Sequence, residues 1–309
     1  MDDVFKLPPL SYKGNEQKKL TLHLFLQIIG KIRMDKTERK NHWWYITEYI
    51  STKGFSTGPI PYKAGTETFQ ITINVRKHLL EVENSLGGYG SFELVPDLSV
   101  AEFYKKLSDI LQSQNIAYAI LDKPFELNIE KKFSEISDVH QYDKNYVTTL
   151  WKTMIWIDGV FKEFSGRFYG KTCPVQLYWH SMDLTVTRFS GRKAPPMPKE
   201  ARLSDKDAYS HEVISFGFWP GDANVTEPAF YSYTYPSPKD LEKENLKPDT
   251  AAWVDNNNSP MALLKYADLI KEKNPRKVLL DFMESAYQAG AKLAMWDVEG
   301  FTVPDLEEL

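Results

Sequence analysis

The chain has 309 residues, of which 42% are hydrophobic and 26% are charged, and its net charge is −4 with the six histidines taken as neutral. This composition is typical of a globular protein with a sizeable core, in one large domain or two smaller ones. Because no surplus of lysine and arginine is available to neutralise phosphates, the balance argues against nucleic-acid binding.

The sequence also predicts the compartment. Cys173 is the single cysteine, which excludes an internal disulfide and gives no hint of a structural zinc site. The acidic first residues lack the apolar stretch of a secretory signal. The longest apolar run, Leu20–Ile32, is interrupted by His23, Gln27 and Lys31 and is too short to cross a membrane. We therefore expect a soluble, cytoplasmic protein without a membrane partner, and the oligomeric state stays open.

The first half of the chain alternates between helix and strand patterns. Residues 1–18 contain Pro8 and Pro9 and predict an extended lead-in, and Leu20–Met34 has apolar residues at helical spacing. A second helix begins at Ser99, which forms a capping box with Glu102. β-Branched and aromatic residues predict strands over His42–Thr52, Phe69–Val75, Leu79–Val82, Ser91–Val95 and Ala117–Leu121.

After a charged link, the same order of elements is predicted again. Long helices are expected at Tyr146–Phe168 and Pro275–Trp296, and Ser259-Pro260 predicts the start of another helix that includes Leu263–Lys271. Strands are expected at Val175–Phe189, as one bent strand or two, at Ala229–Tyr235 and at Ala252–Asp255.

The fold class expected from this order is α+β, with antiparallel sheets and flanking helices. As a hypothesis, residues 19–129 and 130–309 are two pseudo-repeated halves, packed together as one module with a cleft where they join. Convergent amphipathic patterns would give the same likeness, so a true duplication stays open.

Several short segments occur together in a specific order. With these segments the chain resembles a group of uncharacterised, mainly bacterial proteins that share a domain of unknown function, and the resemblance runs from about Leu20 to Trp296. It implies a single full-length module, and it brings no established activity with it. The segments are NHWW (Asn41–Trp44), KEFSGRF (Lys162–Phe168), DLTVTRFSGR (Asp183–Arg192), YSHE (Tyr209–Glu212), FWPG (Phe218–Gly221) and EPAFYSY (Glu227–Tyr233).

The stretch from Asp158 to Tyr235 mixes charged residues with tryptophan, phenylalanine and tyrosine, which indicates a lined pocket. Arg188 and Arg192 flank a Ser-Gly turn, and arginine suits carboxylate or phosphate groups; salt bridges to Glu163, Asp183 or Glu212 are the alternative. We expect a small polar or anionic ligand in an aromatic-lined cleft between the halves, without a bound cofactor. The candidate ligand-binding residues are His23, Gln27, Lys31, His42, Trp44, Asp183, Arg188, Arg192, Ser210 and Trp219.

For the helical stripe of His23, Gln27 and Lys31, a solvated outer face is the alternative to a cavity wall. A competing hypothesis is an acid–base or hydrolytic enzyme in which His211 works with Glu212 or Glu227. The alternative to this enzyme hypothesis is structural: residues around Ser210 form a loop that enters a short helix, and Ser210 caps it.

No metal is assigned, because the histidines form neither an H-x-x-x-H nor an H-E-x-x-H pair; only a convergence of His23, His42 and His211 would change that. A third hypothesis is a structural or partner-binding module. The binding hypothesis requires Arg188, His211 and Trp219 to face one cavity. A salt-bridge network around Arg188 that is closed to solvent would instead favour the structural or partner-binding module.

Overall fold

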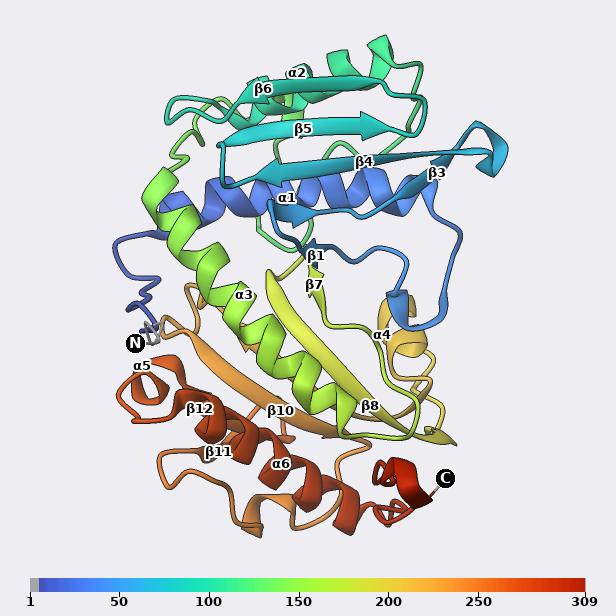
Figure 1. The fold of residues 1–309 in the computed structure, drawn as a ribbon, viewed down its shortest axis with the longest axis vertical. Coiled ribbons are helices and arrows are strands. Elements are labelled where there is room, and N and C mark those ends of the chain that lie inside the picture. The colour runs from blue at the N-terminus through green and yellow to red at the C-terminus, as the bar shows by residue number, and fades with distance from the viewer. Residues whose placement is uncertain (1–5, 309) are drawn as a thin grey trace.

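The computed structural model describes residues 6–308, which form two six-stranded antiparallel sheets and six α-helices (Figure 1). The expected α+β class is confirmed. None of the helices within these residues is both long enough and apolar enough to span a membrane. The helices are α1 (Glu16–Lys36), α2 (Val100–Ser113), α3 (Lys144–Gly166), α4 (Leu203–Ala208), α5 (Tyr266–Leu269) and α6 (Pro275–Leu293).

The first sheet belongs to the N-terminal half and has the strand order β1-β2-β4-β5-β6, with β3 paired to the same side of β4 as β2. α1 and α2 pack against it (Figure 1). Its strands are β1 (Tyr49–Ile50), β2 (Gly54–Ser56), β3 (Ile60–Tyr62), β4 (Glu67–Asn74), β5 (Leu79–Asn84) and β6 (Tyr89–Glu93).

The second sheet has the order β11-β12-β10-β9-β8-β7, and α3 and α6 lie side by side across one face of it (Figure 1). The helix-facing side chains include Phe216, whose ring lies 4.7 Å from that of Phe164 on α3. Its strands are β7 (Gln176–Tyr178), β8 (Asp183–Lys193), β9 (His211–Trp219), β10 (Ala229–Tyr235), β11 (Ala252–Asp255) and β12 (Pro260–Lys265).

The two sheets meet at a single bridge in the middle of the molecule. The Glu48 amide donates to the Leu177 carbonyl at 2.9 Å, and the Leu177 amide donates back at 2.8 Å. One hydrophobic cluster contains residues from both halves, for example Phe25 and Phe216. Each half runs helix, antiparallel strands, helix, but this order alone does not establish a duplication, so the pseudo-repeat stays a prediction.

Three predicted elements differ in the structure. His42–Thr52 is mostly a short 3-10 turn (Asn41–Trp43) and a loop, with a strand only at its end, because His42 and Trp43 have left-handed backbone angles. Ala117–Leu121 is not a strand. Pro260 begins β12 rather than a helix, since alternate residues of that segment are buried and proline is tolerated at a strand's first position.

Candidate functional site

Three predicted wall residues on α1 instead hold loops in place. The ring Nε2 of His23 lies 3.0 Å from the carbonyl oxygens of both Trp179 and His180, so it carries the proton and donates. Gln27 exchanges two hydrogen bonds with the backbone of Phe125, at 2.8 and 3.0 Å. Lys31 donates to the carbonyls of residues 121 and 123. All three side chains are buried, so this stripe is neither a solvated face nor an open wall.

Arg188 is sealed on the helix side of the second sheet. It is 1% exposed, and its guanidinium carbon lies 3.6 Å from the centre of the Phe164 ring. It donates to the Phe164 carbonyl at 2.7 Å, and Glu284 is 3.7 Å away. Desolvation lowers the pKa of Arg188 to about 10, against the opposing effect of Glu284. A ligand cannot reach this guanidinium, so Arg188 does not meet Arg192 at an anion site.

Arg192 and Glu212 form an ion pair between β8 and β9. Arg192 Nε donates to Glu212 Oε2 at 2.8 Å, and Ser190 Oγ donates to the same oxygen at 2.8 Å. The guanidinium also donates to the carbonyls of Ala294 and Met295, beyond the last residue of α6. A cation at a helix C-terminus is favourable, so this arrangement is structural and matches the salt-bridge alternative.

His42 and His211 come together at the same end of this sheet, on the opposite face, with ring centres 5.4 Å apart. The Trp44 ring lies 5.2 Å from His42, and the Phe189 ring lies 4.8 Å from it. Of the three histidines whose convergence would have reopened a metal site, His42 and His211 come together, whereas His23 lies elsewhere, against the carbonyls of Trp179 and His180. The left-handed backbone at His42 and Trp43 costs roughly 1–2 kcal/mol per residue, and the bond from Trp43 Nε1 to the Ser204 carbonyl holds this turn against α4.

Hydrogen bonds fix how these two imidazoles are oriented. His42 Nδ1 lies 3.0 Å from the Ala208 carbonyl, which only accepts, so Nδ1 carries the proton. Burial lowers the pKa of His42, so its ring is neutral, and its buried Nε2 has no hydrogen-bond partner among the described residues. The Ser210 hydroxyl donates to the Asp207 carbonyl and therefore accepts from His211 Nδ1 at 3.1 Å.

Neither proposed carboxylate joins His211. Glu212 points to the opposite side of β9, since neighbouring strand residues alternate. Glu227 precedes β10 and pairs with Lys265 at 2.6 Å; Ala229 at the start of β10 lies opposite Trp219, the far end of β9 from His211. Trp219 shares this end with Glu227, so Arg188, His211 and Trp219 do not line a common cavity.

Away from the helices, the second sheet carries rows of aligned side chains. Thr185, Gly217 and Tyr231 are neighbours across β8, β9 and β10, and Thr187, Ser215 and Tyr233 form the next row. A Cβ on Gly217 would lie 2.2 Å from the Tyr231 ring, so glycine makes room for that ring. Tyr178 and Tyr209 join from β7 and from the residue after α4. We call Tyr178, Tyr209, Tyr231 and Tyr233, with Asp183, the tyrosine face.

The tyrosine face is linked by hydrogen bonds. Tyr231 donates to Asp183 Oδ2 at 2.5 Å, and the Ser181 hydroxyl donates to the other oxygen of Asp183. Tyr209 donates to Tyr233 at 3.2 Å, and Tyr178 donates to the His42 carbonyl at 3.2 Å. Thus two of these tyrosines bond to predicted site residues, Tyr231 to Asp183 and Tyr178 to His42.

These tyrosines are partly exposed and yet strongly desolvated. Burial raises the pKa of Tyr178, Tyr231 and Tyr233 well above the ordinary value, and Asp183 adds to the shift of Tyr231. They are therefore neutral phenols that donate and accept hydrogen bonds and offer ring surfaces for stacking. The sequence pattern did not identify these tyrosines as site residues, although Tyr231 and Tyr233 alternate in β10.

Lys19 is a second residue that the sequence pattern did not single out. It lies one helical turn before His23 on the same stripe, is 5% exposed, and has a pKa lowered to about 8 by desolvation. The carboxylates that act on it, Asp222 and Asp183, partly oppose this shift. The four-residue spacing from His23 could have revealed it, but a lysine in a first helical turn usually lies in water.

A hollow of about 530 Å³ lies between β1, the C-terminal part of α3 and residues 172–175. Its charged residues, Asp158 and Lys162, pair with each other at 2.5 Å. It contains none of the predicted site residues. We therefore place the candidate site on the tyrosine face.

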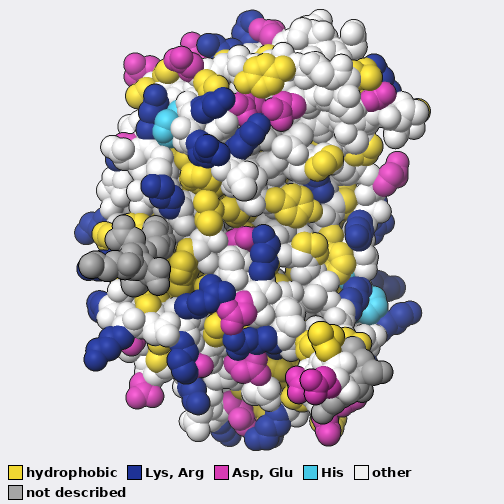
Figure 2. Space-filling model, in the orientation of Figure 1, with side chains coloured by type: hydrophobic (Ala, Val, Ile, Leu, Met, Phe, Trp, Pro, Cys, Tyr) yellow, Lys and Arg dark blue, Asp and Glu magenta, His cyan; other side chains and the backbone are white. Residues whose placement is uncertain are grey.

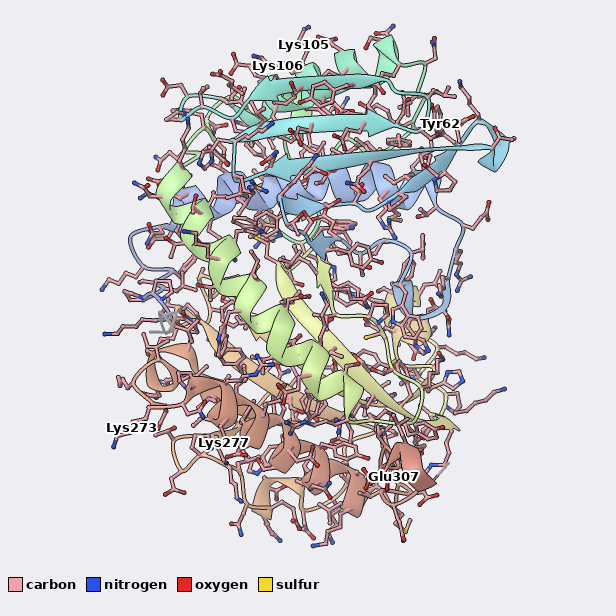
Figure 3. The ribbon with its side chains drawn as sticks, in the orientation of Figure 1. Tyr62, Lys105, Lys106, Lys273, Lys277 and Glu307 are labelled. Carbon is pink, nitrogen blue, oxygen red and sulfur yellow. The ribbon has the colours of Figure 1, made fainter. Side chains whose placement is uncertain are left out.

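Neither charged patches nor groups of three metal-ligating side chains give a further site on the described residues. Lysine and arginine are interspersed with aspartate and glutamate on the surface in view in Figure 2. Lys105 and Lys106 on α2 lie at the opposite end of the molecule from Lys273 and Lys277 near the start of α6 (Figure 3). Within residues 6–308, no three histidine, cysteine or acidic side chains are grouped to hold a metal ion.

No curated protein and no solved structure matches the chain. The model of a family of unknown function, DUF5996, matches residues 7–303, which confirms the expected resemblance and extends it at both ends beyond Leu20–Trp296. The chain belongs to this family.

Proposed function

We propose that this chain binds a small polar or anionic molecule on the tyrosine face of the second sheet. The observation that carries the proposal is the convergence of four tyrosines from β7, the end of α4 and β10, partly exposed but largely desolvated. Such hydroxyls and rings would hold a ligand by hydrogen bonds and stacking, as polar groups do in small-molecule sites. A cleft lined jointly by Arg188, His211 and Trp219 is not part of this proposal, because these three residues do not face one cavity and Arg188 is sealed.

We propose ligand binding rather than hydrolysis because His211 lacks the carboxylate partner that a hydrolytic mechanism would use. The hydrolytic alternative needs a carboxylate that orients His211, and among the described residues no ion pair or hydrogen bond joins His211 to one. The sealed Arg188 fits a structural role for that residue, as the third hypothesis requires. A partner-binding module would also need a joint apolar patch on the surface, and it stays the third hypothesis.

The test is a thermal-shift screen of metabolites on the wild type and three variants. Tyr231→Phe and Tyr233→Phe each remove a hydroxyl from the tyrosine face, and Tyr169→Phe removes an exposed one elsewhere. A true ligand should raise the melting temperature of the wild type and of Tyr169→Phe, and bind roughly 5- to 10-fold more weakly to the two site variants. Equal binding to all four proteins would refute the assignment of the tyrosine face.

A further inference from the structure

His42 and His211 are anchored by the same short segment of the chain. His42 Nδ1 donates to the Ala208 carbonyl at 3.0 Å, and His211 Nδ1 donates to the Ser210 hydroxyl at 3.1 Å. The two nitrogens of an imidazole point in widely different directions, so both Nε2 atoms face away from residues 207–210. In the neutral rings each Nε2 carries no proton and presents a lone pair. The two rings therefore offer a pair of unprotonated imidazole nitrogens.

The Nε2 atom of His42 lacks a partner in a buried position. It has no hydrogen bond among the described residues, and its side chain is 4% exposed. A buried acceptor without a donor costs free energy and calls for an explanation, such as a water or an ion at that atom. The backbone of His42 and Trp43 is also left-handed, and strain of this kind is concentrated at functional sites. Both observations indicate that His42 does more than fill space.

We propose that His42 and His211 bind a divalent transition-metal ion such as zinc through their Nε2 atoms. Zinc–nitrogen bonds of about 2.0–2.1 Å at a tetrahedral angle would place the centres of two ligating imidazoles roughly 5 Å apart. The observed centres are 5.4 Å apart, and the rings are inclined by 69° rather than stacked. Donation from Nδ1 to a backbone carbonyl, as His42 makes to Ala208, commonly orients a metal-ligating histidine.

The two imidazoles would leave coordination positions open. Within residues 6–308 no third histidine, cysteine or acidic side chain joins them to form a three-ligand group. Water, or a donor atom of a bound molecule, would complete the coordination, as in metal sites that receive a ligand. The Tyr178 hydroxyl donates to the His42 carbonyl, so the tyrosine face adjoins these positions.

The charges around His42 oppose one another. Lys171, whose Nζ lies 4.8 Å from the centre of the Phe189 ring, disfavours a second cation at His42. Asp207 favours one, because its negative charge also acts on His42. Its Oδ1 pairs with Arg39, but its buried Oδ2 has no partner among the described residues. A second unsatisfied acceptor close to the imidazoles suits a positively charged occupant that carries water.

The experiment measures Zn²⁺ binding by calorimetry in wild type, His42→Asn, His211→Asn and His78→Asn. Asparagine tolerates a left-handed backbone and keeps a side-chain donor in place of Nδ1, but it has no counterpart of Nε2. His78 is the matched control, because its backbone is also left-handed and its Nδ1 lies 3.1 Å from the Tyr142 hydroxyl.

Wild type and His78→Asn should bind one zinc ion. Binding by His42→Asn and His211→Asn should be weakened by at least the roughly 10- to 100-fold that loss of a supporting hydrogen-bond partner causes. Mg²⁺ prefers oxygen ligands and should not compete. Equal zinc binding by all four proteins, no binding by wild type, or displacement of zinc by Mg²⁺ overturns the proposal.

A second measurement covers the case in which the variants at 42 and 211 fail to fold. In proton–nitrogen NMR spectra of the histidine rings of wild type, Zn²⁺ should shift the Nε2 signals of His42 and His211 and leave those of His23 and His78 in place. Unchanged signals of His42 and His211 overturn the proposal. The inference goes beyond the proposed function, and its outcome does not depend on a molecule on the tyrosine face because zinc alone is the probe.

Discussion

His23 shows how a single side chain can be misjudged from its spacing. Its polar character on an otherwise apolar helix indicates a cavity wall or a wet face, but its Nε2 proton is shared between the carbonyls of Trp179 and His180. The partners are backbone groups in a segment more than 150 positions away. A sequence pattern identifies the polar residue, but the fold decides what it bonds.

The burial of His23 predicts a pH dependence of stability. Desolvation, aided by Lys19, lowers the pKa of His23 to about 3, below the value near 6.5 of an unfolded chain. Between these values the unfolded state binds more protons, so the free energy of unfolding should fall as the pH falls, by at most about 1.4 kcal/mol per unit. Urea titrations should show a shallower decline in His23→Gln, whose amide can still donate. Parallel pH profiles of wild type and His23→Gln would contradict the assignment of this pH dependence to His23. The control is His140→Gln, because His140 is exposed.

At the scale of elements, α1 is unusual because residues 21–33 are all buried. Gly30 permits this burial on the side of α1 that faces Trp179. An added Cβ there would lie 2.2 Å from the indole of Trp179, whose Nε1 donates to the Ile46 carbonyl at 2.9 Å and so cannot easily move.

Gly30→Ala should therefore lower the free energy of unfolding by about 1–3 kcal/mol, the usual cost of overpacking a core. Gly159→Ala is the matched control within a helix, since its Cβ would meet nothing within 4 Å. Alanine should stabilise α3 there by about 0.5–1 kcal/mol. Chemical denaturation of both variants measures the difference; a neutral Gly30→Ala would show that Trp179 can retreat.

Elements with strong local signals were predictable. Ser99 and Glu102 form the expected capping box of α2, and the long helices α3 and α6 occur as their periodic patterns indicate. The Asn41–Trp44 turn was not predictable, because its left-handed backbone depends on partners such as Ser204. For the same reason the pairing of His42 with His211 could be considered, but the tyrosine face, assembled from β7, α4 and β10, could not be derived from any one segment.

At the scale of the whole molecule, the two halves are joined where Glu48 bridges to Leu177. The side chain of Glu48 is fully buried there, and neither carboxylate oxygen has a hydrogen-bond partner among the described residues. Arg33 is close enough to act on it, but the two groups form no ion pair within 4.0 Å. Desolvation prevails over this attraction and raises the pKa of Glu48 well above its usual value.

Replacing Glu48 by glutamine should therefore stabilise the junction at neutral pH. Since the folded carboxyl has the higher pKa, the folded state holds more protons, and the free energy of unfolding falls as the pH rises from the unfolded value of about 4.3 towards the folded one. Glu48→Gln should lose this decline and show the higher urea midpoint near neutral pH. Glu81→Gln is the control, because it removes a buried carboxylate that is paired, with Lys53 at 3.2 Å, and should lower the midpoint. If Glu48→Gln lowers it equally, Arg33 and Glu48 act as an ion pair, and the two halves are held together by charge as well as by packing.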